Sequence, residues 1–294
     1  MHIRTSRASI AALPALLVAV VVIALSSALV AGCAPETQPA EDPADMARTD
    51  QGQTAQTPSE PAQPAEPAEP AQPAGPIEPA GALDGYTICI DAGHGDAVST
   101  KAYPNNPDED ESEDGIVQPL GTSGKKAGNE YAVNLKVAKL LQADLEDEGA
   151  TVVMVRTDND AVISPKDRAL VANDCDADMF IRLHCDSAGS STRGFLTLIP
   201  ADTGYQADDG LYKTSQNMGK QMHEQIVDEL GAHDRGTTVR SDQGGFNWCK
   251  VPCVLFEMGN MANAKDDALL ATKSYREKLA SAIADATVSY LTGA

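Results

Sequence analysis

The sequence predicts an α/β fold in which one mostly parallel sheet is covered by helices on both faces. From about residue 86 onward, apolar β-prone runs alternate with segments of helical periodicity. Several runs are almost continuously apolar, which is typical of strands buried on both faces. Strands that alternate with helices indicate parallel neighbours, because a parallel pair needs a crossover connection. The roughly 210 residues of mixed composition suffice for one well-buried domain.

The first strand, residues 86–91, ends in Asp91 and leads into His94 between two glycines. A helix begins at Glu130 and ends at Gly149, since apolar residues recur between them at helical spacing. Ser164 before Pro165 is a helix start signal. Further strands are expected over residues 151–156, 179–184, 194–199, 237–240 and 251–257. Further helices are expected over 164–172 and 211–230, and residues 266–291 form a last helix or a pair of helices.

The first 32 residues have the pattern of a secretory signal. Arg4 and Arg7 precede an uncharged apolar stretch over residues 8–30, which ends in Val-Ala-Gly before Cys33. This ending resembles a bacterial lipobox, which implies cleavage before Cys33 and lipid on its sulfur. The alternative is a retained membrane-spanning helix, for which the stretch is long enough. Either interpretation places the domain outside the cytoplasm and attached to the cell membrane.

Residues 33–83 are expected to form a lipidated cysteine and a disordered tether, because this segment is rich in Pro, Ala, Glu and Gln and lacks aromatic side chains. In a polyproline II conformation, at about 3.1 Å per residue, it would reach on the order of 100 Å. The formal charge of the chain is −21, which disfavours nucleic acid as a partner.

Residues 84–294 are expected to form the catalytic domain, with residues 97–128 as an insertion loop. This loop has little apolar periodicity and contains the acidic run 108–111. A loop of this length inside a domain is usually functional or disordered. An acidic run is most often only solvated, and a cation site or a lid over an active site are the alternatives.

Four chemically active side chains occupy matching places in this predicted topology. His94 follows the first strand, His184 ends the third and Glu257 ends the strand 251–257. The carboxyl ends of parallel strands lie at one edge of a sheet, and Glu130 reaches that edge if the long loop returns there. Two histidines and one carboxylate form a catalytic type of zinc site with an open fourth position. Glu257 is then available as general base and proton shuttle.

Taken singly, each of these residues has a structural alternative. A histidine at a strand end is commonly only hydrogen-bonded, and a glutamate in the first turn of a helix often only complements the helix dipole. The prediction of a metal centre therefore depends on the four groups sharing one edge.

Several motifs in order resemble one enzyme family. They are Ile-Asp-Ala-Gly-His-Gly (90–95), Glu130 with Asn134-Leu135, Val-Arg-Thr (155–157), Arg168 with Ala172-Asn173, Phe-Ile-Arg-Leu-His (180–184) and Val-Pro-Cys-Val-Leu-Phe-Glu-Met-Gly (251–259). This pattern resembles the zinc-dependent N-acetylmuramoyl-L-alanine amidases of the type-3 domain family, over about residues 86–291. The resemblance implies a six-stranded twisted sheet, one Zn²⁺ bound by His94, Glu130 and His184, and Glu257 as the catalytic glutamate.

The sequence departs from the family pattern beside two of these ligands. Asp96 stands where a second glycine is usual, and Cys185-Asp186 stand where Ala-Asn is usual. Both acids are therefore expected to add negative charge near the metal.

Three other residues are candidates for supporting roles. Asp91 is expected either to orient a ligand or to stabilise its turn. Asn134 lies one helical turn after Glu130 and is a candidate for a hydrogen bond at the site, and Arg240 is a weaker candidate for a carboxylate of the peptide stem. The sequence does not determine which of the cysteines after Cys33 form disulfides, and their odd number leaves at least one free thiol. These cysteines are Cys89, Cys175, Cys185, Cys249 and Cys253.

The expected function is hydrolysis of the amide between N-acetylmuramic acid and L-alanine in peptidoglycan, by a protein anchored outside the cytoplasm and facing the cell wall. One alternative is a zinc carboxypeptidase acting on stem peptides. The other is a non-catalytic lipoprotein that binds the cell wall.

Overall fold

The computed structural model describes residues 81–97, 103–109, 119–206 and 210–293. The predicted signal peptide, Cys33 and the tether up to residue 80 lie outside the described residues, as does the acidic run beyond Glu109. The folded domain begins slightly earlier than residue 84. Leu83 is completely buried, and its N–H donates to the Glu148 carbonyl at 2.8 Å, so this residue belongs to the core and not to a tether.

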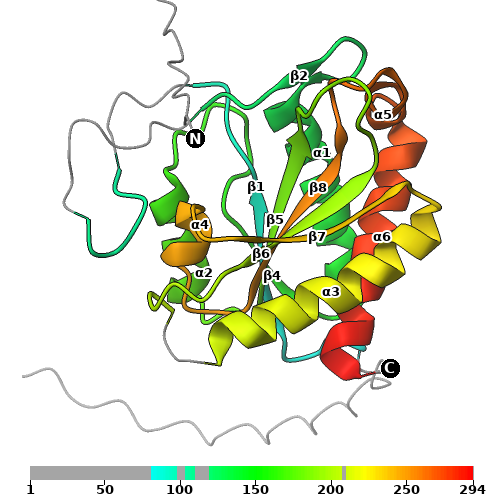
Figure 1. Ribbon diagram of the computed structural model, residues 1–294. Coiled ribbons are helices and arrows are strands. Elements are labelled where there is room, and N and C mark those ends of the chain that lie inside the picture. Colours follow the sequence, from blue (N-terminus) through cyan, green and yellow to red (C-terminus); the bar gives the residue numbers. More distant parts are fainter. Residues whose placement is uncertain (1–80, 98–102, 110–118, 207–209, 294) are drawn as a thin grey trace, which may run out of the picture. The chain divides into compact units, whose positions relative to one another are not determined.

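A six-stranded sheet forms the centre of the domain (Figure 1). Its strand order is β4 (Thr151–Met154), β1 (Thr87–Ala92), β5 (Met179–Asp186), β8 (Cys253–Asn260), β6 (Phe195–Pro200) and β7 (Asp234–Arg240). The first four strands are mutually parallel. β6 pairs antiparallel with β8 and parallel with β7. The predicted α/β class with a mostly parallel six-stranded sheet is thus confirmed.

Helices cover both faces of the sheet (Figure 1). On one face, α1 (Glu130–Asp147), α3 (Leu211–Leu230) and α6 (Lys273–Thr292) pack over the larger apolar core. On the other face, a smaller core lies beneath α2 (Pro165–Asp174) and the short α4 (Gly244–Asn247). In β1, Ile88 and Ile90 belong to the larger core and Cys89 to the smaller one. Strands buried on both faces explain the nearly continuous apolar runs of the sequence.

Local signals set several element boundaries. The Ser164 hydroxyl accepts the Asp167 N–H at 3.0 Å and caps α2 as expected. The C-terminal helical segment divides into α5 (Ala264–Leu270) and α6, because the Thr272 hydroxyl caps a new helix. Within the loop predicted over residues 97–128, β2 (Ser123–Gly124) and β3 (Gly128–Asn129) form a small antiparallel pair directly before α1.

All five cysteines of the described domain are free thiols. Four of them are buried, and Cys175 is partly buried. Burial raises the pKa of the Cys89 thiol well above its ordinary value, which keeps it protonated. Among the described residues, no helix is both long and apolar enough to cross a lipid bilayer.

Candidate metal centre and its cavity

The turn after β1 presents His94 at the carboxyl edge of the parallel strands. His94 has a φ of 63°, in the left-handed region that non-glycine residues rarely adopt. Two arginines hold this turn: Arg168 Nη2 donates to the His94 carbonyl at 2.9 Å, and Arg156 Nη2 donates to the Gly93 carbonyl at 3.1 Å. Since His94 Nδ1 donates to the Pro119 carbonyl at 2.9 Å, its Nε2 carries a free lone pair.

Glu130, the first residue of α1, is held at both carboxylate oxygens. Oε1 accepts the Cys185 N–H at 3.0 Å, and Oε2 accepts the Thr122 N–H at 2.8 Å. Asn134 is fully buried and donates both to Glu130 Oε1 at 3.4 Å and to the Gly93 carbonyl at 3.2 Å. Burial alone would raise the pKa of Glu130, but the adjacent His184 and His94 hold it well below its ordinary value. The carboxylate is therefore ionised.

Nε2 of His94, Nδ1 of His184 and Oε1 of Glu130 converge on one point. The two ring nitrogens are 3.1 Å apart, and each lies 3.2 Å from the Glu130 oxygen. Ligands about 2.0–2.1 Å from a tetrahedral zinc are separated by roughly 3.3 Å, so the spacing fits such an ion. Burial, with the nearby His94 and Arg182, lowers the pKa of His184 to about 4, although Glu130 opposes the shift. His184 is therefore neutral at pH 7, as a metal ligand must be.

Glu257 lies beside this cluster on the next strand, because it is the direct partner of His184 in the β5–β8 register. Its Oε2 is buried and has no hydrogen-bond partner among the described residues. Burial, together with the negative charges of Glu130 and Asp186, raises the pKa of Glu257 to about 8. The cluster is thus flanked by a carboxyl group whose proton is exchangeable near neutral pH.

Asp91 lies beneath the histidine turn and is completely buried. Its two oxygens accept from Arg168 Nη1 at 2.6 Å and from Arg182 Nε at 3.1 Å. Burial alone would raise the pKa of Asp91, but these guanidinium groups hold it well below its ordinary value. Because Arg168 also holds the His94 carbonyl, Asp91 supports the turn through this arginine.

The remaining three candidates lie apart from the converging ligand atoms. Asp96 lines a separate hollow with residues 120–123, Asn129 and Tyr131. Asp186 pairs with Arg235 at 2.6 Å, and Arg240 pairs with Asp242 at 2.7 Å. The negative charge of Asp186 helps to raise the pKa of Glu257. Neither Asp96 nor Asp186 belongs to the cluster of possible metal ligands that the described residues form.

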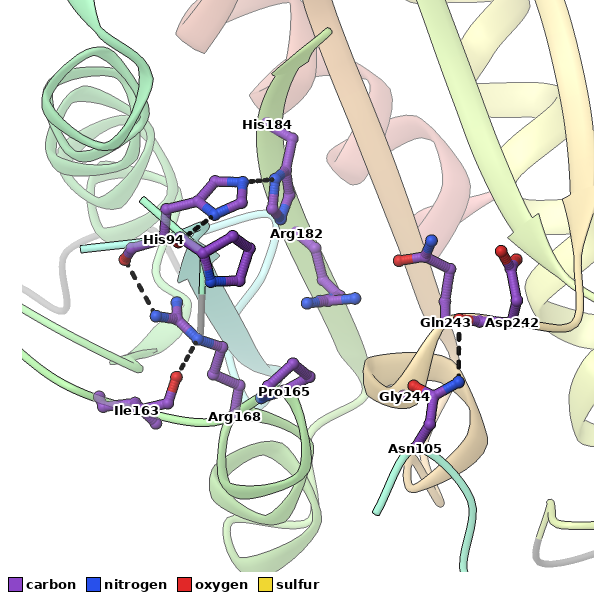
Figure 2. A pocket seen from close by; sticks show the side chains of 11 residues that line it. His94, Asn105, Ile163, Pro165, Arg168, Arg182, His184, Asp242, Gln243 and Gly244 are labelled. Carbon is purple, nitrogen blue, oxygen red and sulfur yellow. Dashed lines mark hydrogen bonds between the residues drawn. The ribbon is translucent and has the colours of Figure 1, made fainter. Parts of the chain in front are cut away.

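A cavity of about 190 Å³ opens directly beside the two histidines (Figure 2). Its walls come from the start of α2 and from the segment that leads into α4, and Arg182 extends between them. Residues 104–106 close one side, since Asn105 Nδ2 donates to the Asp242 carbonyl at 3.0 Å and Trp248 Nε1 donates to the Pro104 carbonyl at 3.1 Å.

Sequence reasoning assigned no role to Arg182 or to the α4 segment. A signal for Arg182 was available, because a charged residue inside the apolar strand 179–184 requires a partner. No comparable signal marks residues 242–244, which reach the cavity only through the folding of the chain.

The fold and the cluster define the chain as an α/β protein in which two histidines and a glutamate that could hold a metal ion meet at a sheet edge. The family described as N-acetylmuramoyl-L-alanine amidase matches residues 88–288. The chain belongs to this family. The match includes both histidines, Glu130 and Glu257 within its span.

Two curated relatives from Bacillus subtilis resemble the chain over the same domain. N-acetylmuramoyl-L-alanine amidase LytC is 32% identical over 207 residues, which are 70% of this chain and 36% of LytC. The uncharacterised protein YqiI is 29% identical over 216 residues, which are 72% of this chain and 88% of YqiI. The chain thus spans only about a third of LytC but most of YqiI.

Solved structures share the fold. The crystal structure of an N-acetylmuramoyl-L-alanine amidase from Clostridium difficile 630 has a TM-score of 0.56 at 27% identity, covering 70% of this chain and 96% of that one. Ami1 from Mycobacterium smegmatis has a TM-score of 0.63 at 24% identity, covering 72% and 99%. This second likeness concerns the fold alone.

Proposed function

We propose that the protein is a zinc-dependent amidase that hydrolyses the bond between N-acetylmuramic acid and L-alanine in peptidoglycan. The observation that carries this proposal is the convergence of His94 Nε2, His184 Nδ1 and Glu130 Oε1 at 3.1–3.2 Å, beside the part-buried Glu257. Membership in the amidase family supports the substrate, and the ligand spacing supports the metal.

These three residues would hold the zinc ion, which when bound polarises a carbonyl oxygen and lowers the pKa of water. The chain itself supplies the groups that fix the ligands and move the proton. The Pro119 carbonyl fixes the tautomer of His94, and Asn134 holds Glu130 in place. His94 thereby presents the lone pair of its Nε2 to the ion.

Glu257 is the proton carrier in this proposal. Its carboxylate accepts a proton from the attacking water and delivers it to the leaving nitrogen of L-alanine. Without a metal its pKa is about 8, and a nearby cation favours the ionised form, which moves the pKa towards the range of a general base. Asp91, Arg168 and Arg156 act at a distance by fixing the turn that carries His94.

We further propose that the protein acts outside the cytoplasm, anchored to the membrane by lipid on Cys33 and connected to its domain by the tether up to residue 80. Support comes from the lipobox pattern and from a relative from Staphylococcus aureus, 30% identical, that is described as the probable cell wall amidase LytH. Incorporation of a labelled fatty acid, lost on Cys33→Ser, tests the anchor.

The enzymatic proposal is tested by incubating the purified protein with peptidoglycan, with and without a chelator, and analysing the products by mass spectrometry. Free stem peptides that begin with L-alanine, absent with the chelator, support the amidase. Release of terminal D-alanine alone would instead identify a carboxypeptidase. Bound zinc without any cleavage would identify a non-catalytic wall-binding protein.

The Glu257→Gln variant tests the proton carrier. It should retain zinc and lose at least about a hundredfold in turnover, because general acid–base catalysis contributes on that order. Glu224→Gln is the matched control, since this glutamate is exposed on α3. Full activity of Glu257→Gln would remove Glu257 from the mechanism.

A further inference from the structure

We propose that Arg182 and the cavity beside the histidines form a carboxylate-binding subsite, which selects stem peptides that carry a free carboxylate close to the scissile bond. This inference rests on the proposed amidase function for its substrate. The binding chemistry itself follows from three features of the described residues: a buried guanidinium that donates to only one acceptor, a carboxylate that this guanidinium shares with a second arginine, and a cavity that Arg182 lines.

Arg182 is buried but incompletely hydrogen-bonded. Its side chain extends from β5 with only 4% of the residue exposed. Nε donates to Asp91 Oδ2 at 3.1 Å, whereas the two terminal nitrogens have no hydrogen-bond partner among the described residues. Nη1 is covered by the backbone of Gly245, so Nη2 is the donor available to a ligand in the cavity. A buried charged donor without an acceptor is costly, so an acceptor bound from solution would be strongly favoured.

The charges around Arg182 also favour an anion. Asp91 is shared between Arg182 and Arg168, so that one carboxylate faces two guanidinium groups. The other nearby acids are already engaged: Asp242 lies in the ion pair with Arg240, and Asp186 in the pair with Arg235. The single carboxylate of Asp91 is therefore shared by two buried guanidinium groups, which leaves Arg182 able to bind a further anion.

The guanidinium is fixed in this position. Its central carbon lies 5.9 Å from the ring centroid of Phe180 and 6.0 Å from that of Phe246. The backbone of Gly245 lies so close that an added Cβ would fall 2.2 Å from Nη1. Because Arg182 is held between these neighbours, a ligand that binds there loses little free energy to reorganisation of the side chain.

The cavity connects this guanidinium to the metal centre. His94, His184 and Arg182 line the same space of about 190 Å³, and Figure 2 shows Arg182 reaching from β5 between the histidines and Gln243. An engineered cavity of about 150 Å³ in another protein holds a benzene molecule, so this one has room for a short carboxylate-bearing group. An amide bond at the metal would thus place a neighbouring substituent of the stem within the reach of Arg182.

The substituent that fits this chemistry is the α-carboxylate of the second stem residue, D-glutamate, which follows L-alanine and occurs either free or as a carboxamide. A carboxylate pairs with a guanidinium through charge-assisted hydrogen bonds, and a carboxamide does so only weakly. The free energies of a charge-assisted and a neutral hydrogen bond differ enough for the carboxylate to bind on the order of tenfold more tightly than the carboxamide, or more.

The first test measures binding without catalysis. The product dipeptide L-alanyl-γ-D-glutamate and its carboxamide analogue are titrated into the metal-free protein and into the zinc-loaded protein by calorimetry. The carboxylate form should bind at least tenfold more tightly in both. Binding of the two forms within twofold of each other by the unaltered protein would overturn the subsite, and this result needs no variant to fold.

The second test uses Arg182→Gln with Arg193→Gln as its matched control, since Arg193 is exposed and lines a different hollow. On soluble muropeptides with a free or an amidated second residue, Arg182→Gln should lose the preference in KM, and Arg193→Gln should retain it. If Arg182→Gln fails to fold, Gly245→Ala provides the same perturbation by crowding Nη1. Retained preference in a folded variant of either kind would contradict the proposal.

Failure of the two proposals gives different results. If neither muropeptide is cleaved, the amidase function is wrong, while the dipeptide titration still decides whether the subsite exists. If both muropeptides are cleaved with equal KM and the dipeptides bind equally, the amidase function stands and the subsite is refuted.

Discussion

Replacing Glu257 by glutamine in the metal-free protein should change how stability depends on pH. Glu257 is nearly isosteric with glutamine, and its Oε2 has no hydrogen-bond partner among the described residues, so the neutral amide replaces the protonated acid with little structural change. The carboxyl group has a pKa of about 8 in the folded protein, against an ordinary value of 4.5. Between these values the folded chain holds a proton that the unfolded chain has released.

The sign and magnitude follow from this difference. Because the folded-state pKa is raised, the contribution of Glu257 is most favourable below pH 4.5 and is lost as the pH rises towards 8. The maximal slope is about 1.4 kcal/mol per pH unit. When this slope is integrated from pH 5 to pH 8, the unfolding free energy of the wild-type protein should fall by on the order of 3 kcal/mol relative to that of Glu257→Gln.

Urea unfolding of both proteins in the presence of a chelator, at pH 5, 6, 7 and 8, measures this quantity. The difference between the two proteins at each pH cancels the titration of all other groups that do not contact Glu257. Exposed Glu224, replaced by glutamine, provides the baseline. The difference in unfolding free energy between the wild type and the variant could instead stay constant within about 0.5 kcal/mol over this pH range. That result would refute the inference that the surroundings of Glu257 disfavour its ionised form.

Three further substitutions test other parts of the site. Asp91→Asn leaves Arg168 and Arg182 without their shared carboxylate and should cost roughly 3–5 kcal/mol, seen as a fall in Tm of about 10 °C, whereas an unchanged Tm would contradict the role of this ion pair. Asn134→Ala should preserve the fold but weaken zinc binding about 10- to 100-fold in competition with a chelating dye, and unaltered affinity would show that Glu130 needs no such support. Ser164→Ala should lower the free energy of unfolding by about 1 kcal/mol in urea titrations without affecting zinc affinity, because it removes only the cap of α2.

The convergence of the four principal residues was predictable because it depends on topology more than on side-chain detail. His94 and His184 follow or end parallel strands, and parallel strands place their carboxyl ends at one edge. Glu257 is brought beside His184 by the β5–β8 register, which the two apolar runs set. Glu130 reaches the same edge because the preceding loop returns there, with the Thr122 N–H bound to its carboxylate.

The parts that sequence reasoning did not predict depend on contacts between distant segments. Nothing local indicates that residues 104–106 bind the α4 segment about 140 residues later, or that this contact encloses a cavity. The position of the Asp96 side chain could not be predicted from the sequence either, since a carboxylate two residues after a metal ligand can point towards the ligand or away from it. The antiparallel direction of β6 relative to β8 likewise depends on how the chain crosses the sheet, which apolar periodicity does not encode.

Because arginines hold the turn after β1, the stability of the fold should not depend on whether a metal ion is bound. The carbonyls of Ala92, Gly93 and His94 are all bound by Arg156 or Arg168, so the chain itself orders the ligand loop. Small zinc domains differ, because their metal supplies the folding free energy and a chelator unfolds them. Here, removal of the proposed zinc ion should leave the protein folded but inactive, and activity should return when the ion is restored, without refolding of the chain.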